Sequence, residues 1–185
     1  MKKLAYLILA LCLSTLALAD TTATKVTPLN LPAGQSAGEI TGSIKDGQKI
    51  PLDWAASSSV ALFPGTRFEM FNGNHVFYRI AMPAGSKIEI TLTPEKGKLI
   101  NLYALRQGPE ETAAPPNITS TISSEAKYPR YANLGGGRKA SDPDNGIRKI
   151  EFISIDRPYS ILIGVAGAQG LTEGDYKLHI NITGR

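Results

Sequence analysis

Two short stretches decide the fold that this sequence predicts: Lys-Ile-Glu-Ile-Thr-Leu at residues 87–92 and Tyr-Lys-Leu-His-Ile-Asn-Ile at residues 176–182. In each stretch every second residue is apolar or aromatic, and the residues between them are polar. Successive side chains of a β-strand point to opposite faces of a sheet, so this period of two predicts strands with one buried face. The expected core residues are Ile88, Ile90, Leu92, Tyr176, Leu178 and Ile180.

Seven further candidate strands lie between turn signals along the chain. They span residues 39–44, 49–54, 67–71, 75–82, 99–106, 147–155 and 159–165. The turns carry glycines that supply the positive φ of tight hairpins, namely Gly47, Gly73, Gly85, Gly97, Gly146 and Gly174. No window after residue 19 keeps a helical period over three turns. Together these features predict an all-β, antiparallel, jelly-roll-like β-sandwich.

Residues 1–19 have the pattern of a secretory signal peptide. Two lysines precede an apolar run, and Ala17 and Ala19 place small residues where a signal peptidase cuts. The run is shorter than the roughly 20 apolar residues that cross a bilayer. We therefore expect cleavage after Ala19, no membrane span in the mature chain, and a periplasmic or extracellular location. The single cysteine, Cys12, lies inside the run, so the mature chain can form no internal disulfide.

The composition describes one soluble domain. The chain has 185 residues, of which 42% are hydrophobic and 19% charged, too apolar for intrinsic disorder. Without residues 1–19, 18 basic and 16 acidic side chains leave a net charge of +2. Such a nearly neutral chain lacks the basic face of a nucleic-acid binder. We expect residues 20–37 to form a lead-in segment or an edge strand with no core, and residues 38–185 to form the sandwich.

A long segment rich in proline and glycine spans residues 107–146, and only residues 118–122 in it resemble a strand. Loops of this length are uncommon in compact domains and are usually functional or disordered. The segment contains Tyr128, Arg130 and Tyr131, and tyrosine and arginine often anchor interfaces. We take these three as candidate binding residues. The alternative is that the tyrosines pack the loop onto the sheet.

Several stretches resemble the bacterial pre-peptidase C-terminal domain. They are residues 73–80, 83–90 and 100–103, followed by residues 149–165 and 174–178. The resemblance covers roughly residues 38–182 and implies a jelly-roll-like β-sandwich that stands alone here. Domains of this family usually accompany secreted peptidases and are regarded as binding or solubility modules. Leu99 and Asn101 stand where the family has aspartates, so the resemblance does not carry a family calcium site to this chain.

Two further kinds of site have structural alternatives. Trp54 ends an alternation with Ile50 and Leu52 that favours a core face, but an exposed tryptophan is also a platform for sugars. Asp142 and Asp144 are candidate calcium ligands, although a Pro/Asn/Gly turn explains the same residues. We expect no other cofactor.

The sequence contains no convincing catalytic constellation. Ser36 lies in a Gly-x-Ser-x-Gly pattern, but a nucleophile elbow requires a strand before the serine and a helix after it. His75 and His179 are expected on the surface. We therefore expect a non-enzymatic recognition module that binds a protein or a polysaccharide through the long loop. The alternative is a structural subunit of a larger envelope or extracellular assembly.

Overall fold

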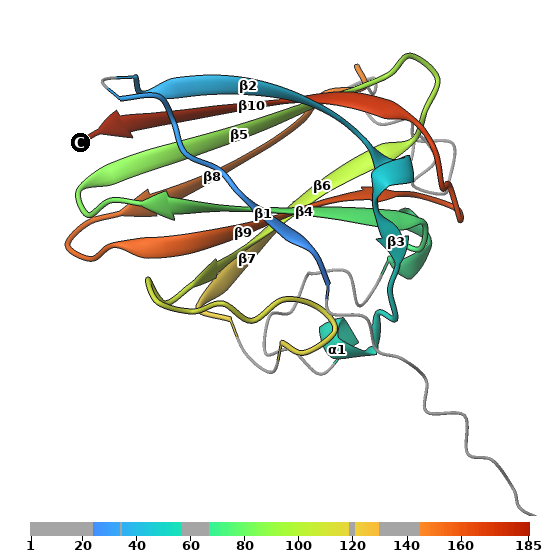
Figure 1. Cartoon of the computed structure of the whole chain (residues 1–185), viewed down its shortest axis with the longest axis horizontal. Coiled ribbons are helices and arrows are strands. Elements are labelled where there is room, and N and C mark those ends of the chain that lie inside the picture. Colours follow the sequence, from blue (N-terminus) through green and yellow to red (C-terminus); the bar gives the residue numbers. More distant parts are fainter. Residues whose placement is uncertain (1–23, 34, 57–66, 119–120, 130–144) are drawn as a thin grey trace, which may run out of the picture.

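The computed structural model describes residues 24–33, 35–56, 67–118, 121–129 and 145–185. These residues form two β-sheets that pack face to face, with short helices and loops at one side (Figure 1). The predicted all-β sandwich is confirmed. Among the described residues, no helix has the length and apolar character that a membrane crossing requires.

The first sheet has four strands and is antiparallel throughout, with the order β2-β10-β5-β8. Its strands are β2 (Ala37–Ser43), β10 (Asp175–Gly184), β5 (Ser86–Pro94) and β8 (Arg148–Ser154). All six core residues predicted from the two alternating stretches are buried on its inner face. The period of two therefore identified the two central strands of this sheet correctly.

The second sheet has the order β1-β4-β9-β6-β7, and β3 also pairs with β4. Its strands are β1 (Val26–Pro28), β3 (Gln48–Lys49), β4 (Asn74–Met82), β6 (Ile100–Gln107), β7 (Ser123–Lys127) and β9 (Tyr159–Gly167). β1 is parallel to β4, so this sheet is mixed rather than purely antiparallel. β1 lies at an edge of this sheet, as the edge-strand alternative for residues 20–37 expected, but Leu29 and Leu31 pack against the core, which was not expected.

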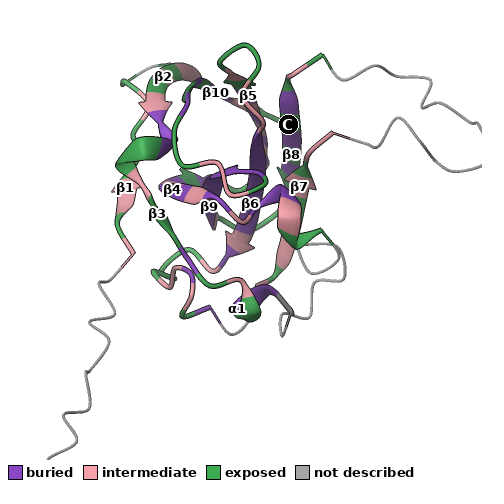
Figure 2. Cartoon of the chain, turned by 90° about the vertical axis from the view of Figure 1, so that its right-hand side faces the viewer, coloured by how far each residue is buried: buried purple, intermediate pink, exposed green. Residues whose placement is uncertain are grey.

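The second sheet is buried on both faces. In β9, Ile161, Ile163 and Val165 enter the core between the sheets, whereas Leu162 and Ala166 point to a second apolar cluster on the other face. Figure 2 shows β9 and β6 as buried strands in the interior of the molecule. This sheet therefore requires a cover on its outer face as well as the facing sheet.

The outer cover is built from segments that we expected to be strands. Residues 53–56 form the helical turn α1 (Asp53–Ala56), and residues 68–70 form the 3-10 helix η2 (Phe68–Met70). The predicted strands at residues 49–54 and 67–71 were therefore wrong, apart from Lys49, which is the second residue of β3 (Gln48–Lys49). Their apolar side chains still reach the second cluster, because Trp54, Met70 and Phe71 are buried there. Packing on the sheet decides their conformation, since runs this short have no clear period.

The long segment after β6 is partly ordered as a strand and partly tethered. The strand is β7, which pairs with β6. Of the strand expected at residues 118–122, the described residues 118, 121 and 122 belong to no strand, and residues 119–120 lie outside the described residues. Residues before it are held by Arg79, whose guanidinium donates to the carbonyls of Glu111 and Ala113 at 2.7 and 2.8 Å. The same group donates to Gln107 Oε1 at 2.7 Å. One arginine on the outer face of β4 thus fixes the start of the loop.

Four of the six expected glycine turns have positive φ, namely those at Gly85, Gly97, Gly146 and Gly174. Gly47 and Gly73 do not have a positive φ. They are glycines because a side chain at either position would collide with a neighbouring backbone. A Cβ on Gly47 would lie 2.0 Å from the carbonyl oxygen of His75, and one on Gly73 would lie 2.1 Å from that of Leu171. Both positions allow backbones to approach each other closely.

Ile90 tests the position of the core, because its side chain is 0% exposed in the central region of the first sheet. We expect Ile90→Ala to lower the free energy of unfolding by about 2–5 kcal/mol through lost burial and the cavity left behind. Ile155, which is 75% exposed, is the matched control. Denaturant titration should place Ile155→Ala within about 0.5 kcal/mol of the wild type. Equal losses in the two variants would contradict the assigned core.

Candidate functional site

Two buried tyrosines join the sheets at one end of the sandwich. Tyr78 of β4 and Tyr176 of β10 point into the core from opposite sheets, and their hydroxyl oxygens lie 2.8 Å apart in a hydrogen bond. Burial raises the pKa of both phenols, and the nearby carboxylate of Asp46 raises them further. Both hydroxyls are therefore protonated at neutral pH and are able to donate.

Gly42 makes room for this pair. It is the cross-strand partner of Tyr176 in β2 and faces the core. A Cβ at this position would lie 2.6 Å from the hydroxyl oxygen of Tyr176 and 2.7 Å from that of Tyr78. A glycine at an inward position of a strand marks such a close approach. Any side chain here would separate the tyrosines.

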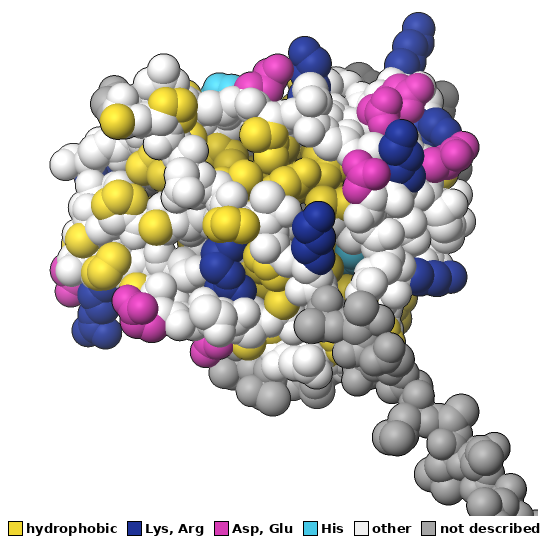
Figure 3. All heavy atoms as spheres, in the orientation of Figure 1, with side chains coloured by type: hydrophobic (Ala, Val, Ile, Leu, Met, Phe, Trp, Pro, Cys, Tyr) yellow, Lys and Arg dark blue, Asp and Glu magenta, His cyan; other side chains and the backbone are white. Residues whose placement is uncertain are grey.

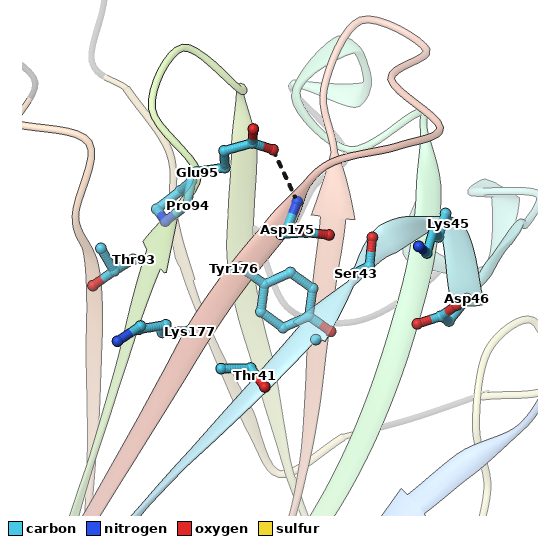
Figure 4. Close-up of a pocket in the computed structure, with 11 residues that line it drawn as sticks. Thr41, Ser43, Lys45, Asp46, Thr93, Pro94, Glu95, Asp175, Tyr176 and Lys177 are labelled. Carbon is cyan, nitrogen blue, oxygen red and sulfur yellow. Dashed lines mark hydrogen bonds between the residues drawn. The ribbon is translucent and has the colours of Figure 1, made fainter.

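A hollow of about 510 Å³ lies beside the pair, at the ends of β2, β10 and β5 (Figure 4). Strand register places Thr41, Lys177 and Thr93 in one row across the three strands. Ser43 and Asp175 are partners in the next row, and Glu95 lies beside Asp175. The 3-10 helix η1 (Ile44–Asp46) adds Lys45 and Asp46 at the edge.

The polar groups of this hollow are partly engaged with one another. The amide of Asp175 donates to Glu95 Oε2 at 3.3 Å, as the dashed line in Figure 4 shows. Ser43 Oγ donates to the carbonyl of Gly174 at 3.2 Å. Lys177 Nζ lies 3.4 Å from a carboxylate oxygen of Glu39. The exposed Thr41 and Thr93 leave hydroxyls at the surface between these charges.

Two neighbouring hollows adjoin the first one and share lining residues with it. One of about 680 Å³ lies between β1, β2 and β4 and shares Thr41, Gly42, Ser43 and Asp46 with the first. Another of about 470 Å³ shares residues 93–95 and reaches Arg148 at the start of β8. In Figure 3, charged side chains gather at the upper right of the face that carries β1 and β2, and hydrophobic ones lie near its middle. We call the three adjoining hollows together the end groove.

Sequence reasoning missed the end groove. Its residues come from strands that are distant in the chain, so register brings them together and no local motif marks them. The one local signal was Gly42, a glycine at a core-facing position of the predicted strand 39–44. It indicated a close approach of another group but not which group.

The candidate binding residues of the long loop fall in different places. Tyr128 is half-buried, and its ring meets the edge of Phe71 with centroids 5.7 Å apart. It thus contributes to the second cluster, as the alternative in the sequence analysis anticipated. Arg130, Tyr131, Asp142 and Asp144 lie outside the described residues. Among the residues that are described, no group of three or more acidic, histidine or cysteine side chains is placed to hold a metal.

Trp54 lies in the core and not on the surface. It is 5% exposed, and its ring lies 6.5 Å from that of Tyr103. The core interpretation of its alternation with Ile50 is confirmed, although the residue belongs to a helix. A side chain in this position does not present a flat face to a sugar.

His75 is buried, so the expectation of a surface histidine was wrong for this residue. Its side chain is 1% exposed on the outer face of β4. Nε2 lies 2.6 Å from the carbonyl oxygen of Phe71, and Nδ1 lies 2.9 Å from the hydroxyl of Tyr103. Because a carbonyl only accepts, Nε2 carries the proton and Nδ1 accepts from the tyrosine. Burial lowers the pKa of His75 to about 4, partly opposed by the bond to Phe71.

The other candidate catalytic residues have no catalytic surroundings. His179 is exposed on the outer face of β10, as expected. Ser36 is exposed at a bend, and the strand β2 follows it where a nucleophile elbow would need a helix. Within the described ranges, neither serine nor histidine therefore forms a nucleophile and base pair of the kind that acyl transfer needs.

Comparison with known proteins finds likeness only at the level of structure. The chain matches no protein-family model and no curated protein sequence. A periplasmic inhibitor of g-type lysozyme from Aeromonas hydrophila is similar with a TM-score of 0.45 and 12% identity, over 87% of this chain and 98% of that one. The pre-peptidase C-terminal domain of a Bacillus anthracis collagenase has a TM-score of 0.39 and 11% identity, over 89% and 100%.

A third similar structure is CorA, a surface-associated copper-binding protein of Methylomicrobium album BG8. Its TM-score is 0.41 and its identity 11%, over 88% of this chain and 99% of that one. One of these similar structures is a pre-peptidase C-terminal domain, the family that the sequence resembles.

The buried His75 should make stability depend on pH. The unfolded chain binds a proton near pH 6.5, whereas the folded chain binds it only near pH 4. The contribution of His75 to the free energy of unfolding is therefore fully present above pH 6.5 and is lost as the pH falls toward 4. We expect a loss of about 2 kcal/mol between pH 7.5 and pH 5, measured by denaturant titration. His75→Gln, which cannot titrate, should show a smaller loss over that range. An unchanged pH dependence in the variant would contradict this assignment.

Proposed function

We propose that this chain is an exported, non-enzymatic recognition module that binds a protein through the end groove. The observation that carries the proposal is the set of three adjoining hollows, which follow one another from β1 and β2 over β10 and β5 to the start of β8.

The chemistry of the groove fits recognition better than catalysis. Its acids and bases alternate over short distances, and Lys177 is already paired with Glu39. Its hydroxyls are not aligned with a base, since Ser43 donates to a backbone carbonyl and His75 uses both ring nitrogens in the core. Mixed charges at the rim of an interface favour specificity for one partner.

A protein partner is favoured over a polysaccharide by the aromatic residues. Tyr78 and Tyr176 are 7% and 3% exposed, so neither ring offers an open face to a ligand. Trp54 is similarly buried. Sugar sites rely on exposed aromatic faces, and backbone and hydroxyl groups suit a polypeptide better. The signal-peptide pattern at residues 1–19 supports export, and the intact mass of the mature protein tests cleavage after Ala19.

Blocking the groove tests this function. Thr93 is an exposed groove residue, so Thr93→Trp should fill the hollow and weaken retention of the partner from the exported fraction of the source at least about tenfold. Thr91 lies two residues earlier on the same face of β5 and outside the hollows, so Thr91→Trp is the matched control. Both variants should melt near the wild type.

Three other outcomes have definite meanings. Equal binding by both variants would contradict the role of the groove. Retention of a glycan instead of a protein would replace the protein partner with a polysaccharide. A permanent stoichiometric complex in native mass measurements would favour a structural subunit over a separate recognition module.

A further inference from the structure

We propose that the partner supplies an extended polypeptide segment that pairs with the free edge of β2 and so adds a strand to the first sheet. This inference rests on the proposed function and specifies how the end groove binds. It follows from the direction of the backbone groups in β2, from the hollow beside them, and from the contrast with β1, which borders the same hollow on its opposite side.

The backbone of β2 alternates between its partner strand and the groove. Ile44 N–H donates to the carbonyl of Gly174 at 3.0 Å, and Ile182 N–H donates to the carbonyl of Ser36 at 2.7 Å. In an antiparallel pair, hydrogen-bonded positions alternate along each strand. Even-numbered residues of β2 therefore face β10, and the N–H and C=O groups of Glu39 and Thr41 face the other way.

That free edge is accessible and has a hollow beside it. In the described part of the chain β2 pairs only with β10, so it ends the sheet. Glu39 and Thr41 are exposed, and Thr41 borders both the 510 Å³ and the 680 Å³ hollows. Natural edge strands are usually blunted by proline, a lysine or a cover. Residues 37–43, Ala-Gly-Glu-Ile-Thr-Gly-Ser, contain neither a proline nor a lysine, and Glu39 is their one charged residue.

The opposite rim of the hollow, β1, is blunted. Leu29 N–H donates to the carbonyl of Arg79 at 2.7 Å, so the odd-numbered residues of β1 face β4. Pro28 then faces away from β4, and proline has no N–H to offer. A guest strand in this hollow therefore finds a regular row of donors and acceptors on β2 only.

The other edge of the first sheet differs as well. The pairing of β5 with β10 through Glu95 N–H and the carbonyl of Asp175 leaves the even-numbered residues of β5 for β8. The odd-numbered residues of β8 therefore face outward, and there the carbonyl of Ile153 accepts from Arg106 at 3.1 Å. The β8 edge is thus partly occupied by a side chain of the second sheet, whereas the β2 edge borders a hollow.

The occupant that fits is a flexible segment of another protein and not a second folded copy. The hollow is bounded by β1 on one side and β2 on the other, with Val76 and Tyr78 among the residues that line it. A single extended strand enters such a space, and its alternate side chains would meet these residues or the solvent. A second sandwich would have to bring its own β1 against this one.

Proline substitutions test the β2 edge against the β8 edge of the first sheet. Thr41→Pro removes an N–H that faces the groove and leaves the hydrogen bonds to β10 in place. Glu151→Pro makes the same change at an outward position of β8 and is the matched control. The probe is an array of synthetic decapeptides in which β-branched residues alternate with varied polar ones. We expect array peptides to bind the wild type and Glu151→Pro within about twofold of each other, and Thr41→Pro at least about tenfold more weakly.

Two measurements on the wild type need no variant. N-methylation of alternate amides in a bound peptide should abolish binding for one set of positions and not for the other, because only one set faces β2. Hydrogen exchange of the Thr41 amide should slow at least about tenfold when the peptide binds, while the Ile40 and Gly42 amides stay protected throughout.

The failures are distinguishable. If no array peptide binds, if Thr41→Pro binds like the wild type, or if both proline variants lose binding equally, strand addition is overturned. If Thr41→Pro binds normally while Thr93→Trp does not, the proposed function stands without strand addition. If both bind normally, both proposals fall. A wild-type dimer in sedimentation that Thr41→Pro dissociates would show that the occupant is a second copy and overturn the partner segment.

Discussion

The burial of both faces of the second sheet is the constraint on which the rest of the structure depends. β9 and β6 carry apolar side chains on both sides, so one facing sheet satisfies only half of them. The other half needs a cover that a simple two-sheet sandwich does not contain. Irregular segments between the strands supply it, and they include α1, η2 and residues 113–118. What looks in sequence like linker is therefore a second core layer.

The difference between strands buried on one face and strands buried on both explains which elements the sequence could predict. β5 and β10 face solvent on one side, so their alternation of polar and apolar residues is strong and located them correctly. β7 is short and polar, and α1 and η2 are too short to show a period. Their conformations depend on packing against the second sheet, which the local sequence does not encode. The parallel pairing of β1 was also hidden, because it is a contact between distant segments.

The site was less predictable than the fold for a related physical reason. A functional motif can be recognised in a sequence when its residues are close together in the chain. The residues of the end groove come from separate strands and are brought together only by strand register. His75 shows the converse. It follows a turn and was expected at the surface, but the carbonyl of Phe71 and the hydroxyl of Tyr103 satisfy both of its ring nitrogens inside the protein. Burial of a polar side chain depends on partners that appear only after folding.

The attachment of the loop after β6 has a consequence for how this sequence can change. Arg79 holds that loop largely through the carbonyl oxygens of Glu111 and Ala113, which every amino acid possesses. Exchanges of side chains at these two positions therefore preserve both acceptors. The guanidinium has no such substitute, because it also donates to Gln107 and Ser160 from a single position. The side chains at these two loop positions can therefore change without loss of the attachment, whereas replacing Arg79 removes all of its hydrogen bonds at once.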